Sequence, residues 1–145
     1  MAKRTLDDYY GMLARAHANL KEAFALQESA AGTPLGDLAR DATVKRYELT
    51  YELLVKSMFE AAKRLPETEQ DEAVVTWTVA HRTWRDMGVG TADLRRYNTF
   101  KKVRNRTTHT YDADVYEEYL DTVLPEFIRE VDSVLTKLKP LLPHD

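Results

Sequence analysis

The chain has 145 residues, 43% of them hydrophobic, so it can bury one sizeable core, and we expect a single domain over residues 1–145. It has no cysteine and only four scattered histidines, which excludes structural disulfides and thiolate metal sites and leaves few ligands for zinc. We therefore predict no metal and no cofactor, and the net charge of −3 argues against a protein that coats nucleic acid indiscriminately.

Nothing in the sequence predicts a membrane segment. No apolar run approaches the roughly 20 residues that span a bilayer. The opening residues, MAKRTLDDYY, lack the apolar stretch of a secretory signal. We therefore expect a cytoplasmic protein without a membrane partner.

Two long helices are expected in the first half of the chain. Between the glycines and prolines, apolar residues recur at intervals of three and four, which is the period of an α-helix. The first predicted helix covers residues 6–28 and ends in the segment AAGTPLGD. The second is capped by Asp37 or Asp41 and continues to about Leu65, with Leu49 among its inward-facing candidates.

Shorter helices are expected in the second half. A third helix covers residues 71–87, and a fourth begins at Thr91 or Asp93. The last begins with acidic residues in capping-box spacing at 114–117, and Pro125 should kink or split it. Four to five antiparallel helices with short connections predict an all-α, up-and-down bundle.

The end of the fourth helix, RNRTTHTY at residues 104–111, has a composition that a bundle does not require. It gathers an arginine, an asparagine, a histidine and a tyrosine among threonines, which are poor helix formers. The twelve residues 95–106 include six basic and no acidic ones. We predict that this segment is where a polyanion contacts the protein, with Lys101, Lys102 and Arg106 as candidate RNA or phosphate ligands.

The spacing of the two most reactive side chains limits the geometry of a site. If the helix persists to Asp112, Arg104 shares a stripe with Tyr111, and Asn105 shares a neighbouring stripe with His109. Arg104 and His109 then point about 140° apart. Either the helix ends early or a second copy of the chain completes the site.

The chemistry of the segment suits phosphodiester cleavage without a metal. His109 changes protonation near neutral pH and can take a proton from a ribose 2′-hydroxyl or give one to the leaving 5′-oxygen. Arg104 can hold a phosphate through two hydrogen bonds. Asn105 can accept from the histidine ring and fix its tautomer.

A purely structural interpretation of the same residues also exists. An arginine at a helix end usually lies in solvent, and a histidine there interacts favourably with the helix dipole. Tyr111 would then be a half-buried packing residue, and the basic segment a solvated face. Under this interpretation the chain is a helical interaction module.

Two separate segments are similar to one known family. The run RNRTTHTYD resembles the HEPN superfamily signature, in particular the branch whose pattern is RN, three residues, then HxY. The segment DATVKRYELTYELLVK (41–56) resembles the second helix of that branch through Tyr47, Glu48, Glu52 and Lys56. The chain departs from the branch pattern at Val55, at Tyr97 and Phe100, and at Pro125, which leaves the motif intact.

The resemblance implies a HEPN-like helical bundle that forms a homodimer, with two Arg/His motifs facing one cleft. Members of this branch are usually encoded beside a minimal nucleotidyltransferase. One description makes them ribonuclease toxins, with the nucleotidyltransferase as an antitoxin that transfers adenylate to the tyrosine two residues after the histidine, here Tyr111. The other makes them non-catalytic substrate-binding subunits of the nucleotidyltransferase.

Glu48 and Glu52 also have two interpretations. With Lys56 they form a stripe of i, i+4 and i+8 positions, which is typically an exposed ladder of ion pairs worth tenths of a kcal/mol per pair. The family resemblance raises the alternative that the two glutamates line the cleft and orient Arg104.

Overall fold

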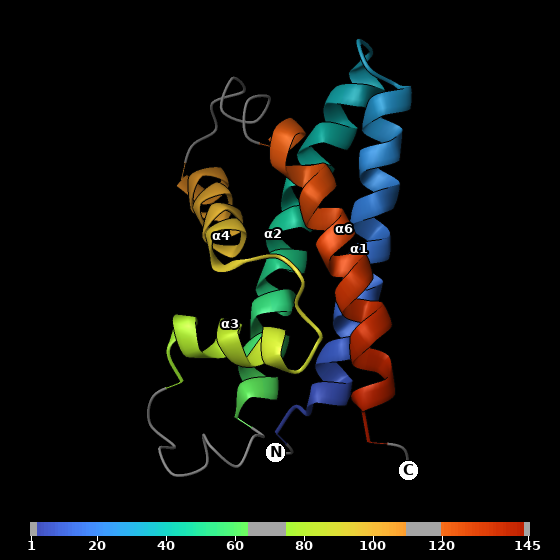
Figure 1. Cartoon of the computed structure of the whole chain (residues 1–145). Helices are drawn as coiled ribbons and strands as arrows, with labels where there is room; N and C mark the ends of the chain where they lie inside the picture. Colours follow the sequence, from blue (N-terminus) through green and yellow to red (C-terminus); the bar gives the residue numbers. More distant parts are fainter. Residues whose placement is uncertain (1–2, 64–74, 110–119, 144–145) are drawn as a thin grey trace.

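Four long helices lie side by side and alternate in direction (Figure 1). The computed structural model describes residues 3–63, 75–109 and 120–143. The long helices are α1 (Leu6–Ser29), α2 (Pro34–Ala62), α4 (Leu94–His109) and α6 (Asp121–Leu138), and α3 (Trp77–Asp86) lies across the bundle near one end. A short 3₁₀ turn, Lys139–Leu141, follows α6. The described ranges contain no strand, so the predicted all-α, up-and-down bundle is confirmed.

Threonines cap the first three helices. Thr5 forms a capping box with Asp8 at the start of α1, which confirms the predicted start at Leu6. For α2 the predicted cap, Asp37 or Asp41, is wrong. The helix begins at Pro34, and the Thr33 hydroxyl accepts the Gly36 N–H at 3.2 Å. Threonine at the cap followed by proline at the first helical position is a favourable start, because proline lacks only an N–H that the first turn does not use.

The starts of the other helices differ in part from expectation. Thr76 caps α3, which begins at Trp77 instead of near Asp71, and residues 64–74 lie outside the described ranges. The Asp93 carboxylate accepts the Arg96 N–H at 2.9 Å, so the prediction of a start at Asp93 is confirmed. The capping box expected at 114–117 is outside the described ranges. Helix α6 runs unbroken through Pro125, so of the predicted kink or split, the split is wrong. A proline this near the helix start leaves only an early carbonyl without its hydrogen bond.

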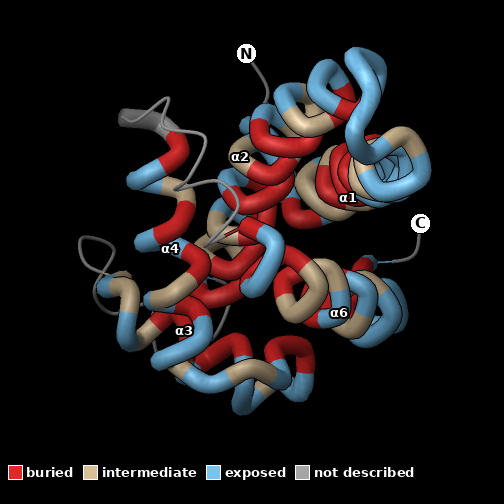
Figure 2. The backbone as a smooth tube through the Cα atoms, turned by 90° about the horizontal axis from the view of Figure 1, so that it is seen from above, coloured by how far each residue is buried: buried red, intermediate tan, exposed pale blue. Residues whose placement is uncertain are grey.

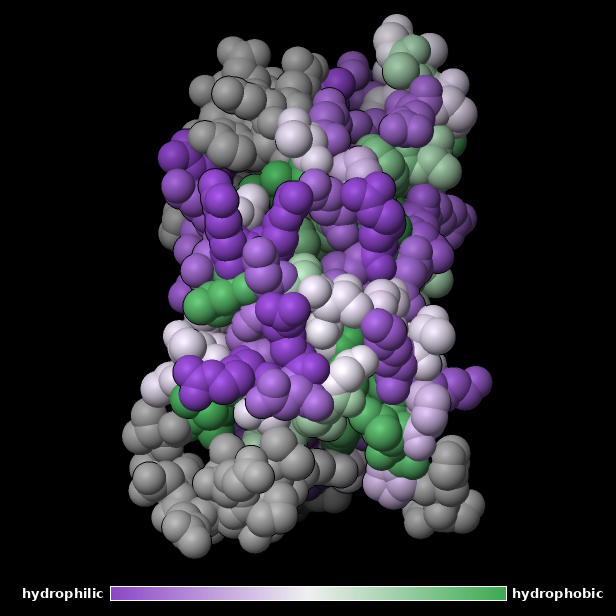
Figure 3. All heavy atoms as spheres, in the orientation of Figure 1, coloured by the Kyte–Doolittle hydropathy of each residue, from purple (hydrophilic) through white to green (hydrophobic). Residues whose placement is uncertain are grey.

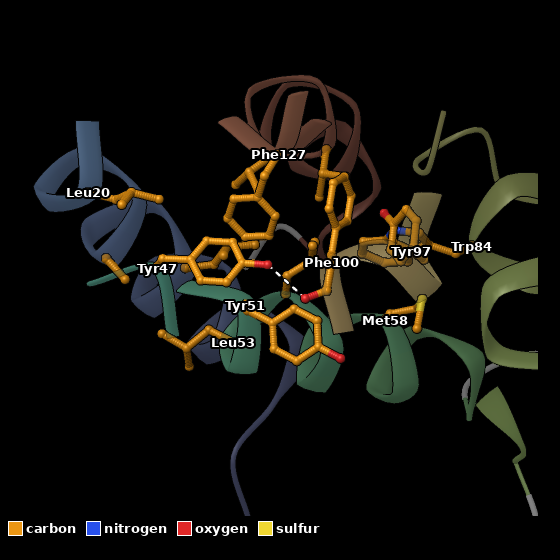
Figure 4. Close-up of a cluster of buried hydrophobic side chains, with 14 of the residues drawn as sticks. Leu20, Tyr47, Tyr51, Leu53, Met58, Trp84, Tyr97, Phe100 and Phe127 are labelled. Carbon is orange, nitrogen blue, oxygen red and sulfur yellow. Dashed lines mark hydrogen bonds between the residues drawn. The ribbon is translucent and has the colours of Figure 1, made fainter. Parts of the chain in front are cut away.

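The core lies between the four long helices and includes side chains of α3 (Figure 2). Its largest fully buried side chains are Trp84, Tyr47, Tyr97, Phe100 and Phe127, with leucines and Met58 between them (Figure 4). Leu49 was predicted to face inward and is 50% exposed. It lies two residues from both Tyr47 and Tyr51, about 200° around the helix from each, so the two buried tyrosines turn it outward.

A buried carboxylate fixes the connection between α3 and α4. Glu130 of α6 is 4% exposed and accepts four hydrogen bonds of 2.5–3.1 Å, from the Thr91 N–H and hydroxyl, the Ala92 N–H and the Tyr97 hydroxyl. Tyr97 also accepts from the Trp84 indole N–H at 2.9 Å. Three helices are thereby joined around one carboxylate, and the amino-terminal end of α4 is held against α6.

No helix in these three ranges is both long and apolar enough to cross a bilayer.

Candidate functional site

The solvent-facing side of α4 is basic along its whole length. The helix carries six basic residues and no acidic one, and Arg95, Lys102 and Arg106 are exposed. At 100° per residue, the positions of these three and of His109 fall within about 60° of arc. The polyanion-binding segment predicted from the sequence is therefore a continuous face of one helix.

Arg104 points to the other side of α4, about 180° from Arg95, and is half-buried. One turn earlier, the buried Tyr47 hydroxyl of α2 donates to the carbonyl oxygen of Phe100 at 2.7 Å (Figure 4). Burial raises the pKa of Tyr51 on α2 to about 12, and the positive charge of Arg104 acts on that pKa in the opposite direction. The half-buried Arg104 therefore lies on the side of α4 that faces α2, within electrostatic range of the Tyr51 phenol.

Asn105 is exposed, and its amide oxygen accepts a hydrogen bond from the Arg104 guanidinium at 3.3 Å. Thr107 is buried, and its hydroxyl donates to the Arg104 carbonyl oxygen at 2.9 Å. Both contacts hold the last turns of α4 around Arg104. The role predicted for Asn105, orienting the ring of His109, stays a prediction, whereas its contact with Arg104 is direct.

His109 is the last residue of α4, and its side chain lies outside the described part of the structure. Its helical position is about 140° from that of Arg104 and about 7.5 Å further along the axis. Tyr111 lies in residues 110–119, which are not described. The convergence of Arg104, His109 and Tyr111 therefore stays a prediction.

The two glutamates of α2 differ in their surroundings. Glu52 is about half exposed and lies 4.0 Å from Lys56, as expected of a surface ion-pair ladder. Glu48 is half-buried, and its Oε1 is buried without a hydrogen-bond partner among the described residues. An unpaired buried carboxylate oxygen is costly, so Glu48 is the stronger candidate for a contact with a ligand or with a second copy.

The remaining basic candidates lie on the outer surface of α4. The Lys101 ammonium lies 5.0 Å from the ring centre of Trp77, in a cation–π contact. The Trp77 indole N–H donates to the Asn98 side chain at 2.7 Å, which fixes the ring under Lys101. Lys102 and Arg106 are exposed. All three are accessible to a phosphate.

Tyr51, which lies within electrostatic range of Arg104, was not predicted from the sequence. Its signal was its position, one turn after Tyr47 on the same face of α2. No cluster of three or more residues with metal-binding side chains occurs within the described residues.

Comparison with known protein families shows which family the chain is related to. The profile of a family described as "Nucleotidyltransferase substrate binding protein like" matches residues 8–140. The chain belongs to this family. The match agrees with the resemblance to the HEPN superfamily and extends it over α1, and the description of the family associates it with nucleotidyltransferases. A search of curated proteins found no significant match.

Proposed function

We propose that this chain is a HEPN-type, metal-independent endoribonuclease that works with a nucleotidyltransferase as a toxin and antitoxin pair. The observation that carries the proposal is the position of Arg104. It contacts Asn105 and lies within electrostatic range of Tyr51, near the end of a helix with six basic and no acidic residues, five positions before His109. A half-buried guanidinium in such surroundings is suited to hold a phosphate as charge develops on it.

The reaction needs only groups of the chain and of RNA. A ribose 2′-hydroxyl loses its proton and attacks the adjacent phosphorus, while the bond from phosphorus to the 5′-oxygen breaks. The products are a 2′,3′-cyclic phosphate and a 5′-hydroxyl, which takes up a proton. His109 moves one of these protons, and Arg104 stabilises the negative charge on the phosphoryl oxygens.

A homodimer would complete the site. Arg104 and His109 diverge by about 140° on one helix, so the motif of one chain does not readily bring both groups to the same phosphate. A second copy that contributes its own motif to a shared cleft removes this difficulty. Glu48, with its unpaired buried oxygen, is a candidate for supporting such a cleft.

The partner nucleotidyltransferase would control activity through Tyr111. In this step the phenolic oxygen attacks the α-phosphorus of ATP, a tyrosine–adenylate bond forms and pyrophosphate leaves. The new phosphodiester would compete with RNA for Arg104 and block the cleft. Labelling of wild type but not of Tyr111→Phe by the purified partner and labelled ATP supports this step, and equal labelling of both variants would refute it.

The nuclease proposal is tested by growth after induction of wild type, Arg104→Ala and His109→Ala at equal protein levels. Arg15→Ala is the control, because Arg15 is an exposed arginine on α1, which lies away from α4 (Figures 1 and 2). Arrest with loss of RNA in wild type and Arg15→Ala alone is the expected result. Equal growth of all four strains with intact RNA would contradict an autonomous toxin.

The family description favours a second candidate, a non-catalytic subunit that binds a substrate for the nucleotidyltransferase. It predicts that the chain co-purifies with the partner and that Arg104→Ala and His109→Ala change the partner's activity without any effect on RNA.

A further inference from the structure

A second basic site lies at the opposite end of α4 from the motif. Helix α3 and the first turn of α4 form an open hollow of about 590 Å³, whose lining includes Arg82, Arg85 and Arg95. All three arginines are exposed, and hydrophilic side chains spread over α3 and α4 on the face shown in Figure 3. Three arginines from two helices therefore line one hollow.

These arginines lack carboxylate partners within the described residues. Two acidic residues also line the hollow, Asp86 and Asp93. The Asp93 carboxylate caps α4 by accepting the Arg96 N–H at 2.9 Å. The imidazole of His81 is buried, and its Nε2 donates a hydrogen bond to the Ala92 carbonyl oxygen at 2.9 Å. The hollow thus keeps an excess of positive charge in a protein of net charge −3.

The adjoining hollow provides a contrast. It holds about 450 Å³ and is lined by Arg85, Arg96 and Arg129 together with Asp93, Glu126 and Glu130. In that hollow the two glutamates have partners: Glu126 forms an ion pair with Arg96, and Glu130 accepts four hydrogen bonds. Equal numbers of acidic and basic residues leave no net attraction for an anion, so of these two hollows the α3–α4 hollow is the one that favours an anion.

The hollow continues into the basic face of α4. Arg95 lines the hollow and also begins the stripe that contains Lys102, Arg106 and the position of His109. Arg95 and His109 are 14 positions apart, which is about 21 Å along a helix. At about 3.4 Å per nucleotide, the rise of one strand of B-form DNA, this length corresponds to about six nucleotides.

We propose that the α3–α4 hollow, through Arg82, Arg85 and Arg95, binds a backbone phosphate of single-stranded RNA about six nucleotides from the bond held at the Arg104/His109 motif. The strand is single because the major groove of an RNA duplex is too narrow to admit α4. Phosphate contacts of this kind position a strand without reading its bases. The choice of RNA rests on the proposed nuclease function, whereas the phosphate site itself rests on the arginines.

The test measures RNA binding by fluorescence anisotropy in a His109→Ala background, so that the RNA stays intact. A trinucleotide is compared with an RNA of about twelve nucleotides, twice the proposed span. The Arg82→Ala/Arg85→Ala double variant should bind the longer RNA about tenfold more weakly and reduce its salt slope by about 0.7, the value for one lost phosphate contact on a single strand. Trinucleotide binding should not change.

Arg129→Ala is the matched control, because Arg129 is an exposed arginine of the adjoining, charge-balanced hollow. It should bind both RNAs as the parent does. Unchanged folding of each variant is checked by its unfolding midpoint. An equal loss in Arg129→Ala, an equal loss for both RNA lengths, or no loss in the double variant would overturn the proposal.

The outcomes separate this site from the nuclease proposal. Length-dependent binding that needs Arg82 and Arg85, in a chain that never cleaves RNA, supports the phosphate site and contradicts the nuclease. Cleavage that needs His109 but not the two arginines supports the nuclease and contradicts the phosphate site. Unchanged RNA binding with loss of the nucleotidyltransferase partner in the double variant would make the hollow a protein-docking surface and overturn the proposal.

Discussion

The hydroxyl of Tyr47 donates a 2.7 Å hydrogen bond to the carbonyl oxygen of Phe100, inside the contact between α2 and α4 (Figure 4). Both residues are almost fully buried. Phe100 is one turn before Arg104, so this single bond fixes how far α4 is displaced along α2 and hence the height of the motif. The position of Arg104 depends on the core and not only on its own helix.

Removal of this bond should cost stability. We expect Tyr47→Phe to lower the free energy of unfolding by about 1 kcal/mol, because the ring still fills its site while the bond to Phe100 is lost. Urea unfolding measures the change. Tyr9→Phe is the control, since the Tyr9 hydroxyl has no hydrogen-bond partner in the described ranges, and its effect should be within about 0.5 kcal/mol. Equal effects of the two substitutions would show that the Tyr47 bond contributes nothing.

Replacement of the Glu130 carboxylate by the isosteric amide of glutamine should destabilise the fold. Each of its two oxygens accepts one backbone N–H, from Thr91 or Ala92, so an amide nitrogen in either position faces another donor. We expect Glu130→Gln to destabilise the fold by about 3 kcal/mol in urea unfolding. Glu126→Gln, which removes a partly exposed pair with Arg96, should cost less than about 1 kcal/mol. A Glu130 variant as stable as the Glu126 variant would contradict the account of the α3–α4 connection.

Two glycines should respond to alanine with opposite signs. A Cβ at Gly90 would overlap the indole of Trp84, which is fully buried, whereas a Cβ at Gly11, within α1, would meet nothing within 4 Å. We expect Gly90→Ala to destabilise by about 1–3 kcal/mol through overpacking. Gly11→Ala should stabilise by about 0.5–1 kcal/mol, because glycine is costly inside a helix. Thermal unfolding of both variants checks the signs, and a shift in the same direction for both would be inconsistent with the described packing.

Stability should fall on mild acidification because of His17. This residue is 2% exposed, its Nε2 lies 2.8 Å from the Asp132 carboxylate, and its Nδ1 is buried without a partner among the described residues. Burial lowers the pKa of His17 below its ordinary value of 6.5 and outweighs the opposing effect of Asp132. The unfolded chain therefore takes up a proton as the pH falls through 6.5, while the folded chain does not, and the folded state loses stability until the pH reaches the folded pKa.

The expected slope is at most about 1.4 kcal/mol per pH unit in this window, measured by urea unfolding above the range in which carboxylates titrate. His17→Gln is the control, because a glutamine amide can still donate to Asp132 but does not titrate. Its slope should be smaller than that of wild type. A slope identical in the two proteins would assign the pH dependence to other groups.

The sequence was sufficient for the helices because their period and end signals are local. Such signals predict the helix starts at Leu6 and Asp93 and the topology of the bundle. Thr33 was overlooked although threonine before proline is also a local signal, and Leu49 was misassigned because a leucine in a long helix has no local mark of which face is buried. Its orientation depends on Tyr47 and Tyr51, which fill the inner face.

The surroundings of the candidate site were less predictable because they depend on residues far apart in the chain. Glu130 is separated by 38 or more positions from Thr91 and Ala92, and the Tyr47 to Phe100 bond joins residues 53 positions apart. The motif itself could be identified from composition and family resemblance. The proximity of Tyr51 on α2 to Arg104, and the arginine hollow beside α3, become evident only once the helices are packed.

Cleavage of RNA by the purified protein in the presence of a chelator tests the central claim most directly. We expect wild type and Arg15→Ala to produce fragments that end in a 2′,3′-cyclic phosphate, and Arg104→Ala and His109→Ala to produce none although both remain folded. Cleavage by His109→Ala at the wild-type rate, or activity abolished by the chelator and restored by a divalent metal, would contradict a metal-independent site at the end of α4.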